Sequence, residues 1–329
     1  MKRLENIHRI LFVRTDRIGD TLMNLPAIHL LRQTYPKAWI TFLCDRKVEE
    51  LFRKNSDLDE VMTVDADSLG NPKNRWDLFQ KIKKAEYQLA IISNPDKFFH
   101  TLIFLARIPH RVGYRRKWGF FLNHALADDK DRNERHEIDS NLNLIRLVSD
   151  LTWDGVIPLR IDENARLKVE DFLSRRGADE MVIAFHVGTT NPLKRWPIER
   201  FSQLADRIQA ESDAKVVLIG GPEERNAGEM VFRQTQISVV DAIGVFSLQE
   251  LAAFLSLKNV KALISSDSGP AHIAWILGTP VVVFFAKNVS GSNSVRWGPR
   301  DGKSEIIEKP MLEISLEDAF SALERVLSK

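Results

Sequence analysis

Short apolar segments alternate with amphipathic segments along the whole chain, and no other feature restricts the fold as strongly. Apolar runs of strand length, each followed by apolar residues at helical spacing, predict parallel strands joined by crossover helices. The expected strands are residues 9–13, 39–44, 61–64, 89–93, 181–185, 216–219, 262–265 and 281–285. The predicted fold class is therefore α/β, with doubly wound parallel sheets.

Capping signals define several of the intervening helices. Ser247 and Glu250 have the spacing of a capping box, and Gly278 is placed to end a helix. Pro26 lies inside the first helical stretch and predicts an irregular first turn, whereas Pro197 is expected at a first helical position. The first expected helix ends near residue 35, and another begins at residue 197. The others cover residues 48–54, 78–85, 142–147, 248–257, 272–277 and 316–327.

The chain has 329 residues, which is the length of two domains at roughly 100–200 residues each. Residues 153–162 contain Gly155 and Pro158 and are the expected linker. We therefore place the domains at residues 1–158 and 159–315. Ligands of open parallel sheets bind outside the carboxyl ends of the strands, so a site is expected in the cleft between the domains.

Composition excludes several classes of protein. Forty-seven Lys and Arg against 45 Asp and Glu argue against a dedicated nucleic-acid binder, which would be strongly basic. The single cysteine, Cys44, cannot form an intrachain disulfide, which favours a reducing cytoplasm. The longest apolar run, residues 281–286, is far shorter than the ~18 residues of a membrane span. We expect a cytoplasmic protein without a nucleic-acid partner.

The turn after the first strand, residues 14–20, places Asp20 directly after Gly19. One interpretation is that Asp20 only caps the helix that follows. The other is that it is a general base that faces a ligand at the carboxyl edge of the sheet. The turn lacks the G-x-G-x-x-G pattern, which argues against a nicotinamide-dependent enzyme.

A second loop, residues 186–197, carries hydroxyl groups on Thr189 and Thr190 and an ammonium on Lys194. Together with backbone N–H groups before a helix, these side chains suit a phosphate. The alternative is an ordinary strand-to-helix connection with solvated cations. The hydroxyls and the ammonium on one short loop favour the phosphate site.

A third loop, residues 265–272, again joins a strand to a helix. A diphosphate could lie across the N–H groups at Ser268 and Gly269, with His272 one turn into the helix. The competing interpretation makes Asp267 or Ser268 a simple N-cap and His272 a core residue.

The segment after the expected strand 216–219, residues 220–224, combines two glycines with two carboxylates. Gly220 and Gly221 permit close backbone approach, and a carboxylate of Glu223 or Glu224 could accept from a ribose hydroxyl. Glycine pairs are also common in plain turns, so this signal is weak alone.

Other chemical patterns are missing from the sequence. The eight histidines are scattered, with no H-x-x-x-H, C-x-x-C or G-x-S-x-G pattern, so no metal or serine-hydrolase site is expected. The D-x-D triplets at residues 57–59 and 65–67 are interpreted as turns. The basic and aromatic stretch 107–118 is either a solvated loop or a surface for an anionic acceptor or an acidic membrane.

Four segments in this order resemble glycosyltransferase family nine, the lipopolysaccharide heptosyltransferases. The resemblance spans nearly the whole chain and rests on residues 14–20 with Pro26, 188–190 with 194–197, 220–223, and 267–269 with His272. It implies the GT-B fold of two Rossmann-like domains facing a central cleft, with the acceptor on the first and the nucleotide-sugar on the second. It also implies that the C-terminal helix, residues 316–329, packs back on the first domain.

The resemblance assigns roles residue by residue. Asp20 matches the catalytic base of the family. A larger set of residues matches the groups that bind the donor and the acceptor in that family. These are Thr189, Thr190, Lys194, Ser268 and Gly269 for the diphosphate; Gly221, Glu223, Glu224 and Phe246 for the nucleoside; Asp267 and His272 for the sugar; and Arg17, Arg115 and Arg116 for the acceptor. Pro270 and residues 191–193 depart from the family pattern.

The expected reaction is therefore inverting transfer of heptose from ADP-heptose to a lipopolysaccharide core acceptor, lipid A-Kdo or heptose, at the inner membrane surface. No metal or other cofactor is expected. Two alternatives stay open: a GT-B enzyme with a different nucleotide-sugar, and a non-catalytic relative that binds a nucleotide-sugar or a glycolipid.

Overall fold

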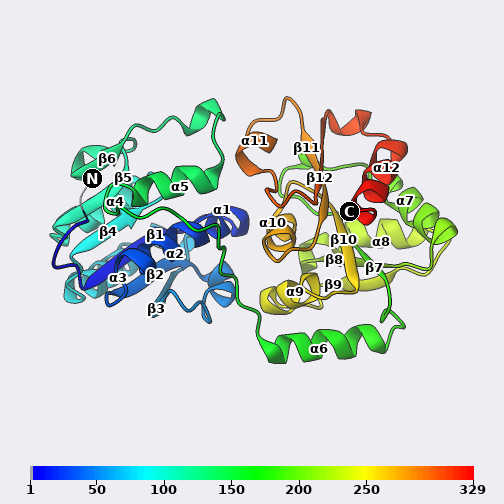
Figure 1. Cartoon of the computed structure of the whole chain (residues 1–329), viewed down its shortest axis with the longest axis horizontal. Coiled ribbons are helices and arrows are strands. Elements are labelled where there is room, and N and C mark those ends of the chain that lie inside the picture. Colours follow the sequence, from blue (N-terminus) through cyan, green and yellow to red (C-terminus); the bar gives the residue numbers. More distant parts are fainter. Residues whose placement is uncertain (1–2) are drawn as a thin grey trace. The chain divides into compact units, whose positions relative to one another are not determined.

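The chain divides into two compact units, Met1–Arg160 and Ile161–Lys329, and the computed structural model describes residues 3–329. Each unit contains one six-stranded sheet with helices packed against it (Figure 1). Neighbouring strands are parallel in both sheets. The predicted α/β fold class is confirmed, and the division of the units falls inside the expected linker.

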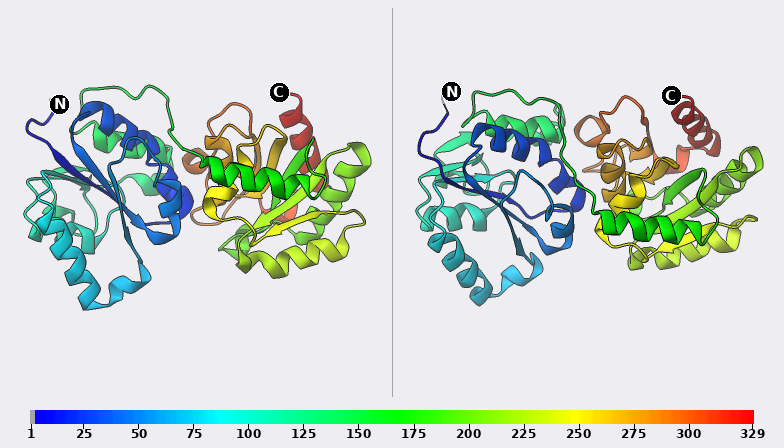
Figure 2. Two further views of the ribbon diagram at one scale, coloured as in Figure 1. Left: turned by 90° about the horizontal axis from the view of Figure 1, so that it is seen from below. Right: turned by 60° about the horizontal axis from the view of Figure 1, so that its bottom comes forward.

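The first unit has the strand order β3-β2-β1-β4-β5-β6. Its strands are β1 (Arg9–Arg14), β2 (Trp39–Asp45), β3 (Glu60–Val64), β4 (Leu89–Ile92), β5 (His110–Tyr114) and β6 (His124–Leu126). Its helices are α1 (Ile18–Leu22), α2 (Leu25–Thr34), α3 (Pro72–Lys84), α4 (Lys97–Leu105) and α5 (Glu137–Ile145). Helices α2 and α5 lie on one face of the sheet, and α3 lies on the other (Figure 2).

The second unit has the strand order β12-β11-β10-β7-β8-β9. Its strands are β7 (Val182–His186), β8 (Lys215–Gly220), β9 (Val240–Ile243), β10 (Val260–Ser266), β11 (Val281–Ala286) and β12 (Glu305–Lys309). Its helices are α6 (Glu163–Ser174), α7 (Ile198–Glu211), α8 (Arg225–Gln234), α9 (Leu248–Leu255), α10 (Gly269–Ile276), α11 (Ser294–Trp297) and α12 (Leu316–Leu327).

Both units repeat the same winding. In each, the chain runs outward from the first strand and then crosses back, so that the direction of winding changes between β1 and β4 and between β7 and β10. Ligands of such sheets bind where the winding reverses, outside the carboxyl ends of these two strands. The topology thus selects the loops after β1, β4, β7 and β10.

Most of the expected helices are confirmed, but residues 48–54 belong to a 3₁₀ helix, Arg46–Leu51, and the turn after it, and α4, α6, α8 and α11 were not expected. Ser247 and Glu250 form the predicted capping box of α9, and Gly278, at φ +89°, follows the end of α10. The first helical stretch is two helices, with Pro26 in the first turn of α2. Pro197 stands one position earlier than expected, at the N-cap of α7. Within residues 3–329, no helix has both the length and the apolar character needed to cross a bilayer.

The C-terminal helix corrects one expectation. Ala319, Phe320, Leu323 and Val326 of α12 are buried in the core that also contains α7 and strands β7, β8, β10 and β11. The expectation that residues 316–329 pack back on the first domain is wrong. An amphipathic helix binds wherever an apolar sheet face is available, and here that face belongs to the sheet of its own unit.

Candidate functional site

The loop after β1 is organised by a buried arginine, Arg14, at the last position of the strand. Its guanidinium forms ion pairs with Asp16 at 3.1 Å, Asp20 at 3.0 Å and Glu137 at 3.1 Å. Burial lowers the pKa of Arg14, but the three carboxylates outweigh this effect and the pKa is raised overall. Lys130 contacts the same Glu137 at 2.7 Å. The carboxyl edge of the first sheet therefore carries a compact charge cluster.

Asp20 lies in the first turn of α1 and is partly exposed. The N-cap position of this helix is Arg17, and no side chain caps it. The interpretation of Asp20 as a simple cap is therefore wrong. Arg14 instead fixes the carboxylate of Asp20 at the edge of the sheet where ligands bind.

The arginines expected to contact the acceptor belong to the same edge of the first sheet. Arg17 is exposed and precedes α1, and Arg115 is exposed directly after β5. Arg116 is paired with Asp128 at 2.7 Å and with Asp131 at 3.0 Å. Arg116 thus holds the loop that follows β6, which makes it a weaker candidate for binding an anion than the other two.

In the second unit, the loops after β7 and β10 bring three predicted side chains together. Lys194 forms an ion pair with Asp267 at 3.0 Å, and Nε2 of His272 lies 3.6 Å from the same carboxylate. Burial raises the pKa of Asp267, but His272 and Lys194 outweigh burial and leave this pKa below its ordinary value. Lys194 also donates to the carbonyl of Gly291 at 2.8 Å, so two of its three N–H groups are engaged. The third can reach a ligand.

The tautomer of His272 follows from its neighbour Trp275. The indole N–H of Trp275 donates to Nδ1 of His272 at 3.3 Å. An indole nitrogen can only donate, so Nδ1 must be the acceptor and the neutral ring carries its proton on Nε2, toward Asp267. Trp275 therefore positions the one titratable side chain on α10.

No side chain caps the N-terminus of α10, because the hydroxyl group at its N-cap position pairs with another hydroxyl group instead. Ser268 occupies the N-cap position but makes no side-chain cap hydrogen bond. Its hydroxyl pairs with that of Ser265 at 2.8 Å, and Ser265 also lies 3.2 Å from Nδ1 of His186. The interpretation of Asp267 or Ser268 as a simple N-cap is wrong, and the first N–H groups of α10 have no side-chain cap to satisfy them. An anion is the partner that such a helix end favours.

The stability of this region should depend on His186. Burial lowers the pKa of His186 to about 4, whereas histidine in an unfolded chain titrates near ~6.5. As the pH falls between these values, the unfolded chain takes up a proton that the folded chain refuses, so stability is lost on acidification, by up to about 3 kcal/mol. We expect the free energy of unfolding in urea to fall less for His186→Gln than for wild type between neutral pH and about pH 4.5. Equal falls would contradict this assignment.

The loop with Thr189 and Thr190 is anchored at its far end by Trp196, which is fully buried. The indole of Trp196 donates to the carbonyl of Ile314 at 3.0 Å and packs against Phe201 and Phe284. Thr190 is exposed, whereas the hydroxyl of Thr189 accepts from the N–H of Asn191 at 3.3 Å. Both threonines thus lie on a short loop that is fixed at both ends and starts beside the buried Gly188.

Glu224 occupies the space that glycines leave open at the ends of β7 and β8. Its carboxylate accepts from the N–H of Gly221 at 2.5 Å. A Cβ added at Gly188 would overlap with this side chain, and one at Gly220 would lie 3.1 Å from it. Burial and the charge of Glu223 raise the pKa of Glu224, and the Gly221 N–H and Arg195 offset only part of this. Glu224 is therefore built into the site, whereas Glu223 is exposed.

Gly188→Ala tests this arrangement. The added methyl group would displace the flexible side chain of Glu224 without a large loss of stability. If Glu224 binds the ribose, ADP affinity should fall about tenfold, as for the loss of one hydrogen bond. Isothermal calorimetry should find Gly188→Ala/Glu224→Ala no weaker than either single variant. Additive losses would contradict the shared cause, and Gly70→Ala, where a Cβ meets nothing within 4 Å, is the control.

Phe246 follows β9 and belongs to an aromatic group within the second unit. Its ring lies 5.0 Å from that of Phe172 and 5.4 Å from that of Phe254. The side chain is only half-buried, so part of the ring is open to a ligand. Its contact with adenine stays a prediction.

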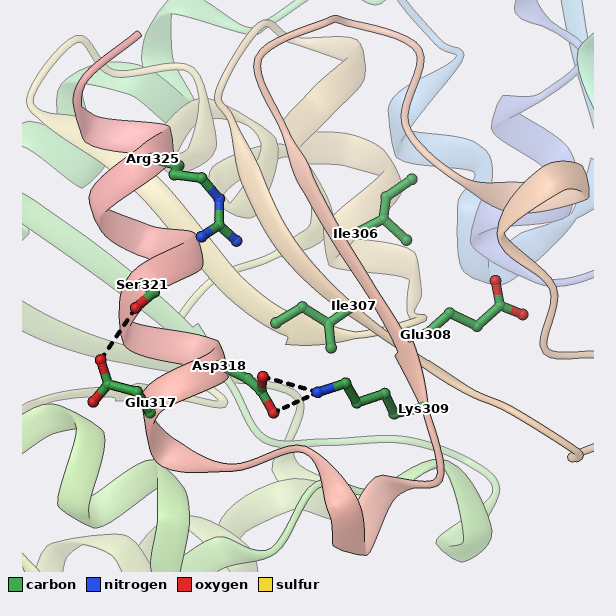
Figure 3. A pocket seen from close by; sticks show the side chains of 8 residues that line it. All are labelled: Ile306, Ile307, Glu308, Lys309, Glu317, Asp318, Ser321 and Arg325. Atoms are coloured by element: carbon green, nitrogen blue, oxygen red, sulfur yellow. Dashed lines mark hydrogen bonds and ion pairs between the residues drawn. The ribbon is translucent and has the colours of Figure 1, made fainter.

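A hollow of the second unit lies elsewhere, between β12 and α12 (Figure 3). It has a volume of about 330 Å³. Lys309 and Asp318 of its lining pair with each other at 2.9 Å, whereas Arg325 pairs with Glu305 and Glu317 with Arg207, both outside the lining. The lining contains three acidic and two basic side chains, so this hollow does not suit an anionic donor. Within residues 3–329, no three His, Cys, Asp or Glu side chains are grouped as metal ligands.

Sequence reasoning missed several residues that hold the side chains of the site in position. It assigned no role to Arg14, Glu137, His186 or Trp275. An arginine at the end of an apolar strand was the only local signal for the first of these. Its partner Glu137 is 123 residues away, which no local pattern reveals.

Three comparisons with known proteins agree with one another. The pattern that defines glycosyltransferase family 9 (heptosyltransferase) matches residues 75–315. Lipopolysaccharide heptosyltransferase 2 of Salmonella typhimurium is 26% identical over 295 residues, which cover 84% of this chain and 82% of that protein. The crystal structure of a family 9 glycosyl transferase from Veillonella parvula superposes with a TM-score of 0.86 at 24% identity, covering 98% of this chain and 97% of that one. ADP-heptose lps heptosyltransferase II of E. coli gives a TM-score of 0.81 at 20% identity, covering 97% and 98%.

Proposed function

The chain belongs to glycosyltransferase family 9, and on this premise we propose that it transfers heptose from ADP-heptose to a hydroxyl group of a lipopolysaccharide core acceptor. The names of its relatives in Salmonella typhimurium and E. coli support this donor and this acceptor. The observation that carries the proposal is the group Lys194–Asp267–His272 beside the uncapped N-terminus of α10.

The second unit would hold the donor. A diphosphate at the N-terminus of α10 would accept from the backbone N–H groups there and from the third N–H of Lys194. Thr189, Thr190 and Ser268 would add hydroxyl donors. Glu224 would accept from the ribose, and Asp267 and His272 would contact the sugar.

Asp20 would act as the general base. The acceptor oxygen forms a bond to the anomeric carbon while the bond from that carbon to the diphosphate breaks, and the hydroxyl proton passes to the carboxylate of Asp20. Attack from the face opposite the leaving group inverts the anomeric configuration. Arg14 would position the carboxylate without touching the substrate. Arg17 and Arg115 would bind the anionic acceptor at the cytoplasmic face of the inner membrane.

We expect turnover without a metal ion, because Lys194 and the N–H groups of α10 can stabilise the diphosphate leaving group. ADP release should be unchanged after treatment with excess EDTA. A loss of activity that Mg²⁺ restores would contradict this expectation.

The decisive experiment varies the donor. Thermal shift with ADP, GDP, UDP and CMP should give the largest rise in melting temperature for ADP. ADP-heptose and an acceptor of lipid A-Kdo or its heptosylated form should then yield ADP and a product heavier by one heptose. Preference for another nucleotide-sugar would identify a different glycosyltransferase, and tight donor binding without turnover would identify a binding protein.

A further inference from the structure

A patch of aromatic side chains is exposed on the first unit, and we call it the aromatic surface. It consists of Phe104, Trp118 and Phe120 around the half-buried Phe121, whose ring lies 4.6, 6.3 and 4.4 Å from theirs. The three outer side chains are 43%, 48% and 73% exposed, and Leu105 beside them is also exposed. Contiguous exposed apolar groups of this size mark a surface that binds something.

The charge of the surrounding segment has one sign. Residues 97–127 contain no Asp or Glu but six basic residues: Lys97, Arg107, Arg111, Arg115, Arg116 and Lys117. The rest of the chain then has 47 − 6 = 41 basic against 45 acidic residues, so the positive charge is concentrated here. Lys97 lies 5.6 Å from the ring of Trp118, and the guanidinium of Arg111 lies 5.5 Å from that of Phe104.

The backbone at Trp118 has an energetically costly conformation. Lys117 and Trp118 are consecutive non-glycine residues with positive φ, 48° and 67°, a conformation that costs free energy and persists only where the surroundings enforce it. The buried His100 donates from Nδ1 to the carbonyl of Lys117 at 2.9 Å. Arg111 donates to the carbonyl of Phe121 at 2.7 Å.

We propose that the aromatic surface docks on a lipid bilayer that contains anionic lipids. Protein interfaces are depleted in lysine, whereas aromatic rings next to Lys and Arg are typical of surfaces that enter the headgroup region of an anionic membrane. The rings would enter the boundary between headgroups and acyl chains, while Lys97, Arg107 and Lys117 contact lipid phosphates. This proposal names the surface by which the protein would reach the membrane of the proposed function, and it does not depend on the reaction.

The test is co-sedimentation of the full chain with vesicles of phosphatidylcholine and phosphatidylglycerol in equal parts, without donor or acceptor. We expect binding to these vesicles, weaker binding to pure phosphatidylcholine, and release at about 1 M salt, where charges are screened beyond ~3 Å. Trp118→Ala/Phe120→Ala should weaken binding at least about tenfold. Lys97→Glu/Lys117→Glu should weaken it by a similar factor or more, since each cation near the membrane accounts for about fivefold.

A matched control tests whether any exposed aromatic ring beside a cation contributes to vesicle binding. Trp39, 45% exposed and 6.0 Å from the guanidinium of Arg9, resembles Trp118 in exposure and in its cation, and Trp39→Ala should bind as wild type does. Circular dichroism spectra and melting curves should match wild type in all variants, which shows that both units are folded, and ADP affinity should be unchanged because the donor residues lie in the second unit. Wild-type protein that stays in the supernatant, variants that bind as well as wild type, or binding that requires the acceptor glycolipid in the vesicle would each overturn the proposal. Failure here leaves heptosyl transfer untouched, because that is measured separately.

Discussion

Asp20→Asn is expected to lower turnover by about 10²- to 10⁴-fold, the contribution of a well-placed general base, while ADP affinity stays unchanged. Asparagine keeps the size of the side chain but cannot accept the acceptor proton. The charge cluster should survive, because Arg14 keeps its ion pairs with Asp16 and Glu137. Steady-state ADP release measures the rate, and calorimetry measures the affinity.

Asp16→Asn is the matched control. It also removes one carboxylate from Arg14, so it reproduces the electrostatic change without touching the proposed base. We expect this variant to lose far less activity than Asp20→Asn, with a similar change in melting temperature. Turnover of Asp20→Asn near the wild-type rate would rule out the base, and equal losses in both variants would assign the effect to the Arg14 cluster as a whole.

The central strands could be predicted from the sequence because both of their faces are buried. Strands of this kind read as continuous apolar runs, as in β11, whose six residues are all buried. The missed strands are β5, β6, β9 and β12. Three of them are edge strands and the fourth lies next to an edge. Solvent on one side permits residues such as His110 in β5 and Glu308 in β12, and the apolar signal is lost.

The candidate site could be predicted only where it is local in the sequence. Motifs after β1, β7 and β10 were found because the topology of a doubly wound sheet brings the carboxyl ends of its strands to one edge. The contact of Glu224 with Gly188 and the pair of Arg14 with Glu137 join distant segments, and only the packed structure reveals them. The same limit explains why α12 was expected on the first domain: its apolar face can be recognised in the sequence, but the sheet against which that face packs cannot.

Lys194→Ala is expected to raise the Kd of ADP roughly 10- to 150-fold, because a hydrogen bond to a charged group contributes about 1.5–3 kcal/mol. The effect should be much smaller for AMP if the ammonium contacts the terminal phosphate of ADP. Lys215→Ala is the control, since Lys215 begins β8 at the opposite end of the strand from the site. Calorimetry with both nucleotides measures these differences, and an unchanged ADP affinity would remove Lys194 from the diphosphate site.

A loss of ADP affinity in Lys194→Ala would have two possible causes, because Lys194 also neutralises the buried carboxylate of Asp267. Without the ammonium, that carboxylate would repel the diphosphate even if Lys194 never touched it. Lys194→Ala/Asp267→Asn removes both charges and therefore distinguishes the two causes. If Lys194 binds the diphosphate directly, the double variant should regain only the part of the affinity that repulsion by Asp267 removed and should stay clearly weaker than wild type. If affinity returns to the wild-type level, Lys194 acts only by neutralising Asp267, and the N-terminus of α10 alone holds the diphosphate.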